Sequence, residues 1–286
     1  MAGPGAQYGG VAVAIVAISF ASILIRWSEA PPDVIAFYRM LLATMVLAPF
    51  ALRSRNRTNL ASLDRRTTAI MLAVGAVLAL HFYAFNASLE LTSVASATVL
   101  VTAHPILVGM LGLLLLNERP RNGGLGLALG LGGVVVISIA DLGGGRLEGD
   151  LLALAGMVAA AVYLLAGRVV RQKVGLINYV LMVYSSCTAV LFLIVLANGS
   201  PLWPYPLQEL LIFLALAIVS TVMGHTVLNW SLRYLPAAFV SVSMLGEPVG
   251  ASILAALLLA EVPAPAVVAG AAMVLAGIAL TAGPGK

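Results

Sequence analysis

Two pairs of residues that join an ionisable side chain to a proline lie inside long apolar runs of this sequence. Glu247-Pro248 lies within the run 239–259, and His104-Pro105 lies 143 residues earlier, within the run 94–116. An ionised acid near the centre of a bilayer costs about 2.5–3.5 kcal/mol on insertion scales, so it is expected to face a cavity or a partner. Neutral imidazole is a cheaper group there and titrates near neutral pH. We therefore expect a polar site inside an apolar protein, with His104 as the natural partner of Glu247.

Other polar and aromatic residues lie at matching depths of the two halves of the chain. On a helix His225 shares a face with Thr221 and Asn229. A few polar groups on an otherwise apolar surface are typical of small-molecule pockets. Each candidate also has a structural interpretation: the acid can be protonated and bonded to a carbonyl freed by the next proline, histidines can be core residues, and aromatics can simply pack. The candidate cavity residues are His81, His104, Glu247, His225, Asn229, Tyr83, Phe20 and Tyr163, with Pro105 and Pro248 as helix-bending residues.

Arg39 is a further charged residue, six positions into the predicted run 33–52. A long basic side chain near a span end can extend to the headgroups. We expect Arg39 to do so, or to pair with Asp33 or Glu29, rather than to contact a solute.

The composition is that of a membrane protein. Hydrophobic residues make up 62% and charged residues 9%, with a mean hydropathy of +1.08, whereas an ordinary soluble domain has roughly 25% charged residues. The pI of 9.5 and net charge of +4 come from basic residues in short loops between apolar runs. This distribution favours anionic lipid headgroups over nucleic acid as the partner.

Apolar runs long enough to cross a bilayer organise the whole chain. A helix needs about 20 residues for this, and proline and glycine clusters separate the runs. We predict an all-α integral membrane protein with ten spans, at 8–26, 33–52, 68–90, 94–116, 123–140, 151–168, 178–197, 209–230, 238–259 and 265–282. Twelve Lys and Arg residues then fall on one side of the membrane, against only Arg26 and Arg146 on the other. Because basic loops stay in the cytoplasm, both termini are predicted to be cytoplasmic.

The chain also matches itself at a displacement of 143 residues. This displacement aligns Asn86 with Asn229, Pro105 with Pro248, and Glu118 with Glu261. Each half, 1–143 and 144–286, holds five predicted spans, and an odd number forces the second half to enter the membrane from the opposite side. Inverted repeats of this kind place a shared site near the bilayer midplane and provide two related packings for alternating access.

The residues of this repeat resemble a known family. The matched segments 113–120 and 256–263 each end a fourth span with a Glu and a following Pro, and the stretch 229–248 has the strongest family character. The whole chain resembles the EamA-type branch of the drug/metabolite transporter superfamily, and within it the YddG-type amino-acid exporters of bacterial inner membranes. The resemblance implies two five-helix repeats around a central cavity and export of small metabolites, including aromatic and apolar amino acids. His104 departs from that family, which often has Glu before the first of the two prolines.

Other functions stay open at this point. Carriers of nucleotide-sugars, sugar-phosphates or cationic drugs belong to the same superfamily, but a phosphorylated solute calls for several buried Lys or Arg donors. An intramembrane enzyme could use His81, His104 and Glu247 as a metal site, yet no hydrolase or metalloprotease motif is present. We expect no enzyme activity and no cofactor. A monomer is expected, with a homodimer through the Gly126/Gly130 face as the alternative.

Overall fold

A computed structural model gives the fold and describes residues 4–51, 53, 63–116, 123–142, 146–235, 240–241 and 243–281. Within these ranges all regular secondary structure is helical, which confirms the predicted all-α class for the described part of the chain. Some residues used in the sequence argument lie outside the described ranges. These are Glu118, the repeat partner of Glu261, and the basic residues Arg55, Arg57, Arg119, Arg121 and Lys286.

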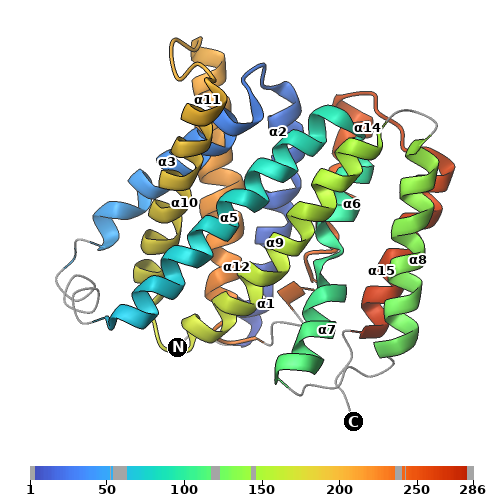
Figure 1. Cartoon of the computed structure of the whole chain (residues 1–286), viewed down its shortest axis with the longest axis horizontal. Helices are drawn as coiled ribbons and strands as arrows, with labels where there is room; N and C mark the ends of the chain where they lie inside the picture. The colour runs from blue at the N-terminus through green and yellow to red at the C-terminus, as the bar shows by residue number, and fades with distance from the viewer. Residues whose placement is uncertain are drawn as a thin grey trace.

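The helices follow one another closely along the chain (Figure 1). In order they are α1 (Pro4–Ser19), α2 (Ala21–Trp27), α3 (Pro32–Ala51), α5 (Arg65–Leu91), α6 (Val94–Thr102), α7 (His104–Leu116), α8 (Gly123–Leu142), α9 (Leu147–Arg171), α10 (Leu176–Asn198), α11 (Leu207–Ala215), η1 (Leu216–His225), α12 (Thr226–Ser231), α14 (Gly246–Leu258) and α15 (Pro265–Thr281).

Local chemistry sets several helix ends. The carboxylate of Asp64 accepts hydrogen bonds from the hydroxyl (2.6 Å) and the backbone N–H (2.8 Å) of Thr67, and so caps α5. These two bonds hold the pKa of the Asp64 carboxyl below its ordinary value. Ser93 caps α6 in the same way through the N–H of Ser96. At the other kind of end, Gly199 terminates α10 with a φ of 68°, a conformation that glycine adopts without steric cost.

Both proline pairs lie where a helix begins within an apolar run. Ala103 separates α6 from α7, and Pro105 is the second residue of α7; Pro248 is the third residue of α14. Proline has no N–H to donate, and the first turn of a helix needs none at these positions. Each proline therefore lies in the first turn of a new helix, which begins at His104 in α7 and at Gly246, one residue before Glu247, in α14.

A second irregularity is the π-helix η1, which lies between α11 and α12. Its wider turns let the hydroxyls of Thr221 and Thr226 donate to carbonyls five residues earlier, at 3.2 and 3.1 Å. Such π segments are rare and occur frequently at functional sites.

Several helices of the described chain are apolar along most of their length. Seven are long enough to cross a bilayer: Tyr8–Trp27, Pro32–Ala51, Arg65–Leu91, Val94–Leu111, Leu147–Arg171, Leu176–Asn198 and Leu207–Ser231. Two shorter apolar helices are Gly246–Leu258 and Pro265–Gly277. The chain is thus a multi-pass membrane protein, while the count of ten spans stays a prediction.

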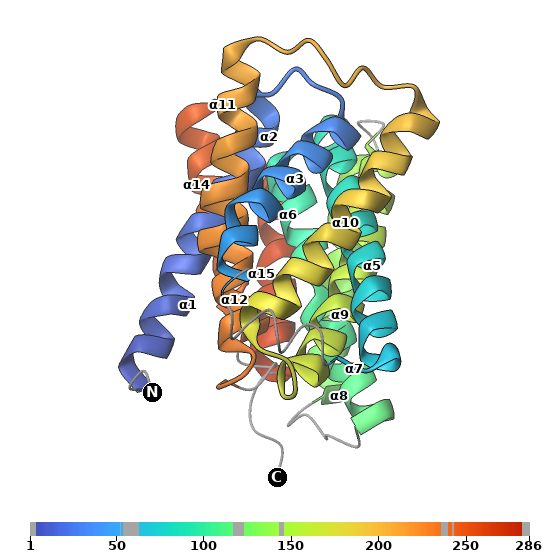
Figure 2. The same ribbon diagram turned by 90° about the vertical axis from the view of Figure 1, so that its left-hand side faces the viewer.

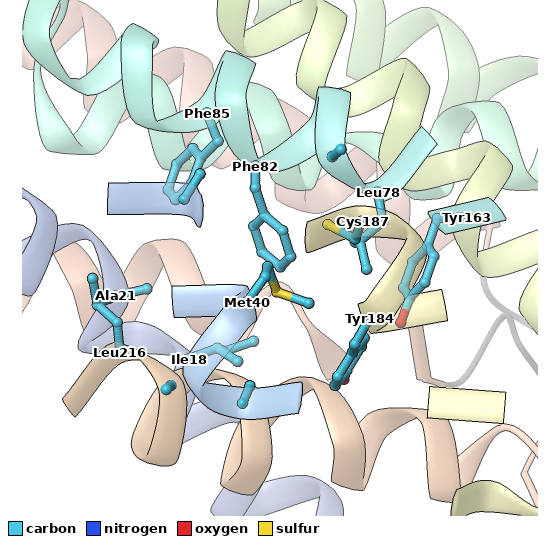
Figure 3. Packing of buried hydrophobic residues seen from close by; sticks show 14 of the residues in the cluster. Ile18, Ala21, Met40, Leu78, Phe82, Phe85, Tyr163, Tyr184, Cys187 and Leu216 are labelled. Carbon is cyan, nitrogen blue, oxygen red and sulfur yellow. The ribbon is translucent and has the colours of Figure 1, made fainter. Parts of the chain in front are cut away.

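The helices pack in pairs that connect distant parts of the sequence. α9 packs along α5, α10 along α3 and α5, and α15 along α8, while α1 contacts both η1 and α14 (Figures 1 and 2). A hydrophobic core fills the space among α1, α3, α5, α10 and η1, and Figure 3 shows Ile18, Met40, Phe82, Tyr184 and Leu216 within it.

α8 and α15 approach each other through glycine. A Cβ added at Gly277 would lie 2.5 Å from the carbonyl oxygen of Gly126 and 2.6 Å from the nitrogen of Gly130. The Gly126/Gly130 face is therefore used for packing within the molecule, where it allows close backbone contact.

The directions of the helices follow from the same views. α1 begins and α15 ends at one end of the bundle (Figure 1). α9 begins at the opposite end, next to the end of α5, where a Cβ at Gly149 would lie 2.8 Å from the backbone of Leu91. α1 and α9 therefore run in opposite directions.

Candidate functional site

A cavity lies inside the helix bundle, with residues from both halves of the chain around it. The space between its walls is about 580 Å³, counted with its opening. Its polar side chains come from α3, α5, α6, α7, α9, η1, α12 and α14, and its apolar wall includes aromatic and aliphatic residues. The lining residues are Ala21, Arg39, His81, Phe82, Phe85, Val101, Thr102, His104, Ala160, Tyr163, Leu164, His225, Leu228, Asn229, Met244 and Glu247.

Glu247 lies in the first turn of α14 and is 8% exposed. Close packing fixes its backbone against α1, because Cβ atoms at Gly246 and Gly250 would lie 2.6 Å from Ile15 and 2.4 Å from Ser19. The positive end of the helix dipole favours negative charge at this position. Among the residues that the structure describes, none donates a hydrogen bond to the carboxylate of Glu247. The carboxylate is therefore positioned but left with acceptor capacity.

Arg39 faces this cavity, so the expectation that it reaches the headgroups or pairs with Asp33 or Glu29 is wrong. It is only 1% exposed, its Nε donates to the hydroxyl of Thr221 at 2.8 Å, and its guanidinium carbon lies 4.2 Å from the ring centroid of Phe82. The hydrogen bond and the cation–π contact draw the side chain inward. Its Nη2 is buried and has no hydrogen-bond partner.

Asp33, one of the expected partners of Arg39, is used elsewhere. Its Oδ2 accepts hydrogen bonds from Asn198 Nδ2 at 3.0 Å and from Ser200 Oγ at 2.8 Å. These contacts join the start of α3 to the end of α10. The carboxylate is thereby satisfied without a cation.

The three histidines lie at the cavity in different bonding situations. His81 donates from Nδ1 to the carbonyl of Gly156 at 2.9 Å, and its ring centroid is 6.4 Å from that of His225. His104 Nδ1 lies 3.3 Å from the hydroxyl of Ser241, and its buried Nε2 has no partner. Within the described ranges, no three His, Cys, Asp or Glu side chains are grouped so that they could hold a metal ion.

Asn229 and Tyr163 form a polar pair at the cavity wall. Asn229 Nδ2 donates to the hydroxyl of Tyr163 at 2.5 Å and to the carbonyl of His225 at 2.8 Å. Its Oδ1 is buried without a partner. The bonded amide nitrogen fixes the side chain so that the oxygen remains available to a donor.

The structure brings six of the eight candidate residues together at this cavity. Phe20 lies between α1 and α2 and is 37% exposed, and Tyr83 is half-buried on α5; neither lines the cavity. Sequence reasoning missed Arg39 as a cavity residue, along with the neighbouring ring of Phe82. The available signal was a charge inside a span, which by default indicates function.

Polar contacts also join the two halves where α2 ends and α6 begins. Arg26 Nη2 lies 3.2 Å from Glu261 Oε2, and the other carboxylate oxygen of Glu261 accepts from the N–H of Val94 at 2.6 Å. Nearby, Glu209 accepts hydrogen bonds from the hydroxyl of Ser28 (2.5 Å) and the N–H of Glu29 (2.8 Å). Two carboxylates of the second half therefore hold backbone and side-chain donors of the first half at this end of the bundle.

The apolar helices and the internal polar cavity define a multi-pass membrane protein that can enclose a small solute. Sequence comparison supports this class: the model of the EamA-like transporter family matches residues 4–139 and again residues 147–283. The chain belongs to the EamA-like transporter family, whose members are membrane transporters of small metabolites, and it contains two EamA repeats.

A solved structure shares the fold. Described as "Crystal structure of protein", it aligns with a TM-score of 0.71 at 20% sequence identity, covering 97% of this chain and 97% of its own. No curated protein matches this chain in sequence.

Proposed function

We propose that this protein exports small metabolites, amino acids with aromatic or apolar side chains among them, by alternating access. The observation that carries the proposal is the cavity, in which the carboxylate of Glu247 accepts no hydrogen bond from a described residue. An ammonium group is the natural partner for such a carboxylate. The apolar wall, with Phe82, Phe85 and Leu164, suits the remainder of an apolar amino acid.

The architecture that we propose for this function has ten spans in two inverted repeats, 1–143 and 144–286. The opposite directions of α1 and α9 support inversion, and Arg39 and Glu247 show that each half contributes to one cavity. Exchange of the conformations of the halves would open this cavity to either side. We place the protein in a bacterial inner membrane with both termini in the cytoplasm, on the distribution of basic loops.

Each cavity residue has a role in this proposal. Glu247 and Asn229 Oδ1 accept hydrogen bonds from the solute. Asn229 Oδ1 and His104 Nε2 are both buried without a hydrogen-bond partner among the described residues. His81, His225 and Tyr163 line the wall. Pro105 and Pro248 lie in the first turns of the helices that carry His104 and Glu247. One chain supplies the cavity, so a monomer suffices for transport.

A carrier of phosphorylated solutes is the competing function, and Arg39 is the observation that favours it. Phosphate recognition generally uses several cationic or backbone donors. Among the described lining residues Arg39 is the one Arg or Lys, and Glu247 lines the same cavity. A dianionic phosphate would meet the charge of Glu247 there, so we rank this function second.

Counterflow in proteoliposomes tests the proposal. Purified protein is reconstituted with unlabelled solute inside, and uptake of labelled amino acids, nucleosides, quaternary cations and sugar phosphates is measured from outside. We expect accumulation of aromatic and apolar amino acids above that in protein-free vesicles. Counterflow of phosphorylated solutes alone would overturn the assignment.

A further inference from the structure

The cavity holds two opposite charges that do not satisfy each other. Arg39 on α3 and Glu247 on α14 both line it and interact electrostatically. Within the described part of the chain, however, the pair does not come within 4.0 Å, the separation of an ion pair. A buried charge without a direct partner is costly, and its cost is offset when a ligand supplies the missing contact.

Arg39 is held in a way that leaves its Nη2 group free to donate. Nε is engaged by Thr221, and the face of the guanidinium lies over Phe82. Nη2 remains as a buried donor without a partner. A guanidinium fixed at one edge and on one face is well suited to bind a carboxylate through its remaining edge.

The unpartnered acceptors of the cavity are on other elements. Glu247 belongs to α14, and Asn229, whose Oδ1 is buried and unbonded, belongs to α12. An ionised carboxylate and an amide oxygen can accept but not donate, so they fit an ammonium group. The free donor and the free acceptors thus match the two ends of one molecule.

We propose that the cavity recognises its solute as a zwitterion, with Arg39 binding the carboxylate and Glu247, assisted by Asn229, binding the ammonium group. This inference rests on the proposed function and narrows it. The site binds both charged groups of the amino acid, and Arg39 makes it specific for solutes that carry a carboxylate. A neutral zwitterion compensates both protein charges at once. A simple amine leaves Arg39 without a partner, and a simple carboxylate leaves Glu247 without one, so each is discriminated against.

Ligands that differ by one charged group test this on the wild-type protein. L-phenylalanine, phenethylamine, which lacks the carboxylate, and 3-phenylpropionate, which lacks the amine, are compared as competitors of L-phenylalanine counterflow in proteoliposomes. Leucine with 3-methylbutylamine and 4-methylpentanoate forms a second set without an aromatic ring. We expect each truncated compound to compete at least about tenfold more weakly than its parent, because it loses a hydrogen bond to a charged group.

Variants then assign each charge to its residue. Arg39→Gln should weaken competition by L-phenylalanine by about tenfold or more and leave that by phenethylamine nearly unchanged, so that the preference for the zwitterion disappears. Glu247→Gln should instead weaken competition by phenethylamine and leave competition by 3-phenylpropionate unchanged. Arg233→Gln, at an exposed arginine of the second half, is the matched control and should leave all three unchanged.

The positioning of Arg39 gives a variant that retains both charges. Thr221→Val removes the hydroxyl that accepts from Arg39 Nε, and we expect a smaller loss of the zwitterion preference with phenethylamine unaffected. If Arg39→Gln does not fold, the wild-type ligand sets and Thr221→Val decide the matter.

Different outcomes would contradict the zwitterion site and the proposed transport function. Equal competition by L-phenylalanine and phenethylamine, or equal losses for both in Arg39→Gln, would overturn the zwitterion site while amino-acid transport stands. Absence of counterflow for every amino acid of the panel would overturn the proposed function itself.

Discussion

Replacement of Glu247 by Gln separates a functional carboxylate from a structural one, because the two roles predict opposite outcomes. The change keeps the shape of the side chain and removes its charge. If the carboxylate binds an ammonium group, the variant loses a hydrogen bond between charged groups, worth about 1.5–3 kcal/mol. At about 1.4 kcal/mol per factor of ten, the KM for an amino acid should rise by roughly 10- to 150-fold.

The stability of the same variant should change little. Removal of the charge recovers a burial cost of about 2.5–3.5 kcal/mol. It also removes the attraction of Arg39, which at separations beyond 4 Å is below about 4 kcal/mol at an effective dielectric constant of about 20. These terms are of similar size and opposite sign, so we expect the free energy of unfolding to change by about 1 kcal/mol or less.

The assay combines proteoliposome counterflow with thermal unfolding in detergent. Glu148→Gln is the matched control, because Glu148 is also an acid in the first turn of a helix but is exposed. It should leave KM and unfolding temperature unchanged. A Glu247→Gln protein that unfolds much more easily yet transports with an unchanged KM would refute the functional reading.

Further predictions concern the packing of the bundle and one of its ends. Gly277→Ala should lower the free energy of unfolding in detergent by about 1–3 kcal/mol, because the new methyl group meets backbone atoms at 2.5 Å. The control Gly109→Ala, whose added methyl group has no neighbour within 4 Å, should be neutral or slightly stabilising. Equal stabilities of the two variants would contradict the close contact between α8 and α15. Glu261→Gln breaks a partly exposed ion pair worth about 0.2–1 kcal/mol and weakens the bond to Val94, so the free energy of unfolding in detergent should fall by about 1 kcal/mol or less. A stability equal to that of the wild type would show that these contacts do not hold the two halves together.

The helices could be predicted from the sequence because hydropathy and helix-ending residues are local properties. The break at Ala103 is a local property as well, since Pro105 follows it. The π segment η1 could not be anticipated, because no residue pattern distinguishes it from the α-helices around it. Its register depends on the packing of α1 and α3 against it.

The direction of a side chain depends on partners that are distant in sequence, and here prediction failed. The sequence predicts that Arg39 extends outward, because its nearest acids are Asp33 and Glu29. It turns inward because Thr221, 182 residues away, accepts its Nε hydrogen. Hydropathy records the charge in the span but carries no information about such a partner.

The internal repeat also predicts less at the level of side chains than at the level of helices. Asn86 and Asn229 match at the displacement of 143 residues, yet Asn86 donates to the carbonyl of Pro32, whereas Asn229 bonds Tyr163 at the cavity. Pairs related by duplication diverge once their neighbours differ. For this reason the repeat in the sequence does not predict which side chains line the cavity, whereas the structure does.

Cysteine accessibility at the cavity wall tests alternating access most directly. Cys187 is buried and would be replaced by Ala, after which Ala160→Cys places a thiol at the cavity and Ala153→Cys places one on the same helix away from it. A membrane-impermeant thiol reagent added from either side of the membrane should label Ala160→Cys, L-phenylalanine should slow this labelling, and Ala153→Cys should stay unlabelled. Labelling of Ala160→Cys from one side only, at a rate that L-phenylalanine does not change, would contradict a cavity that opens in turn to both sides.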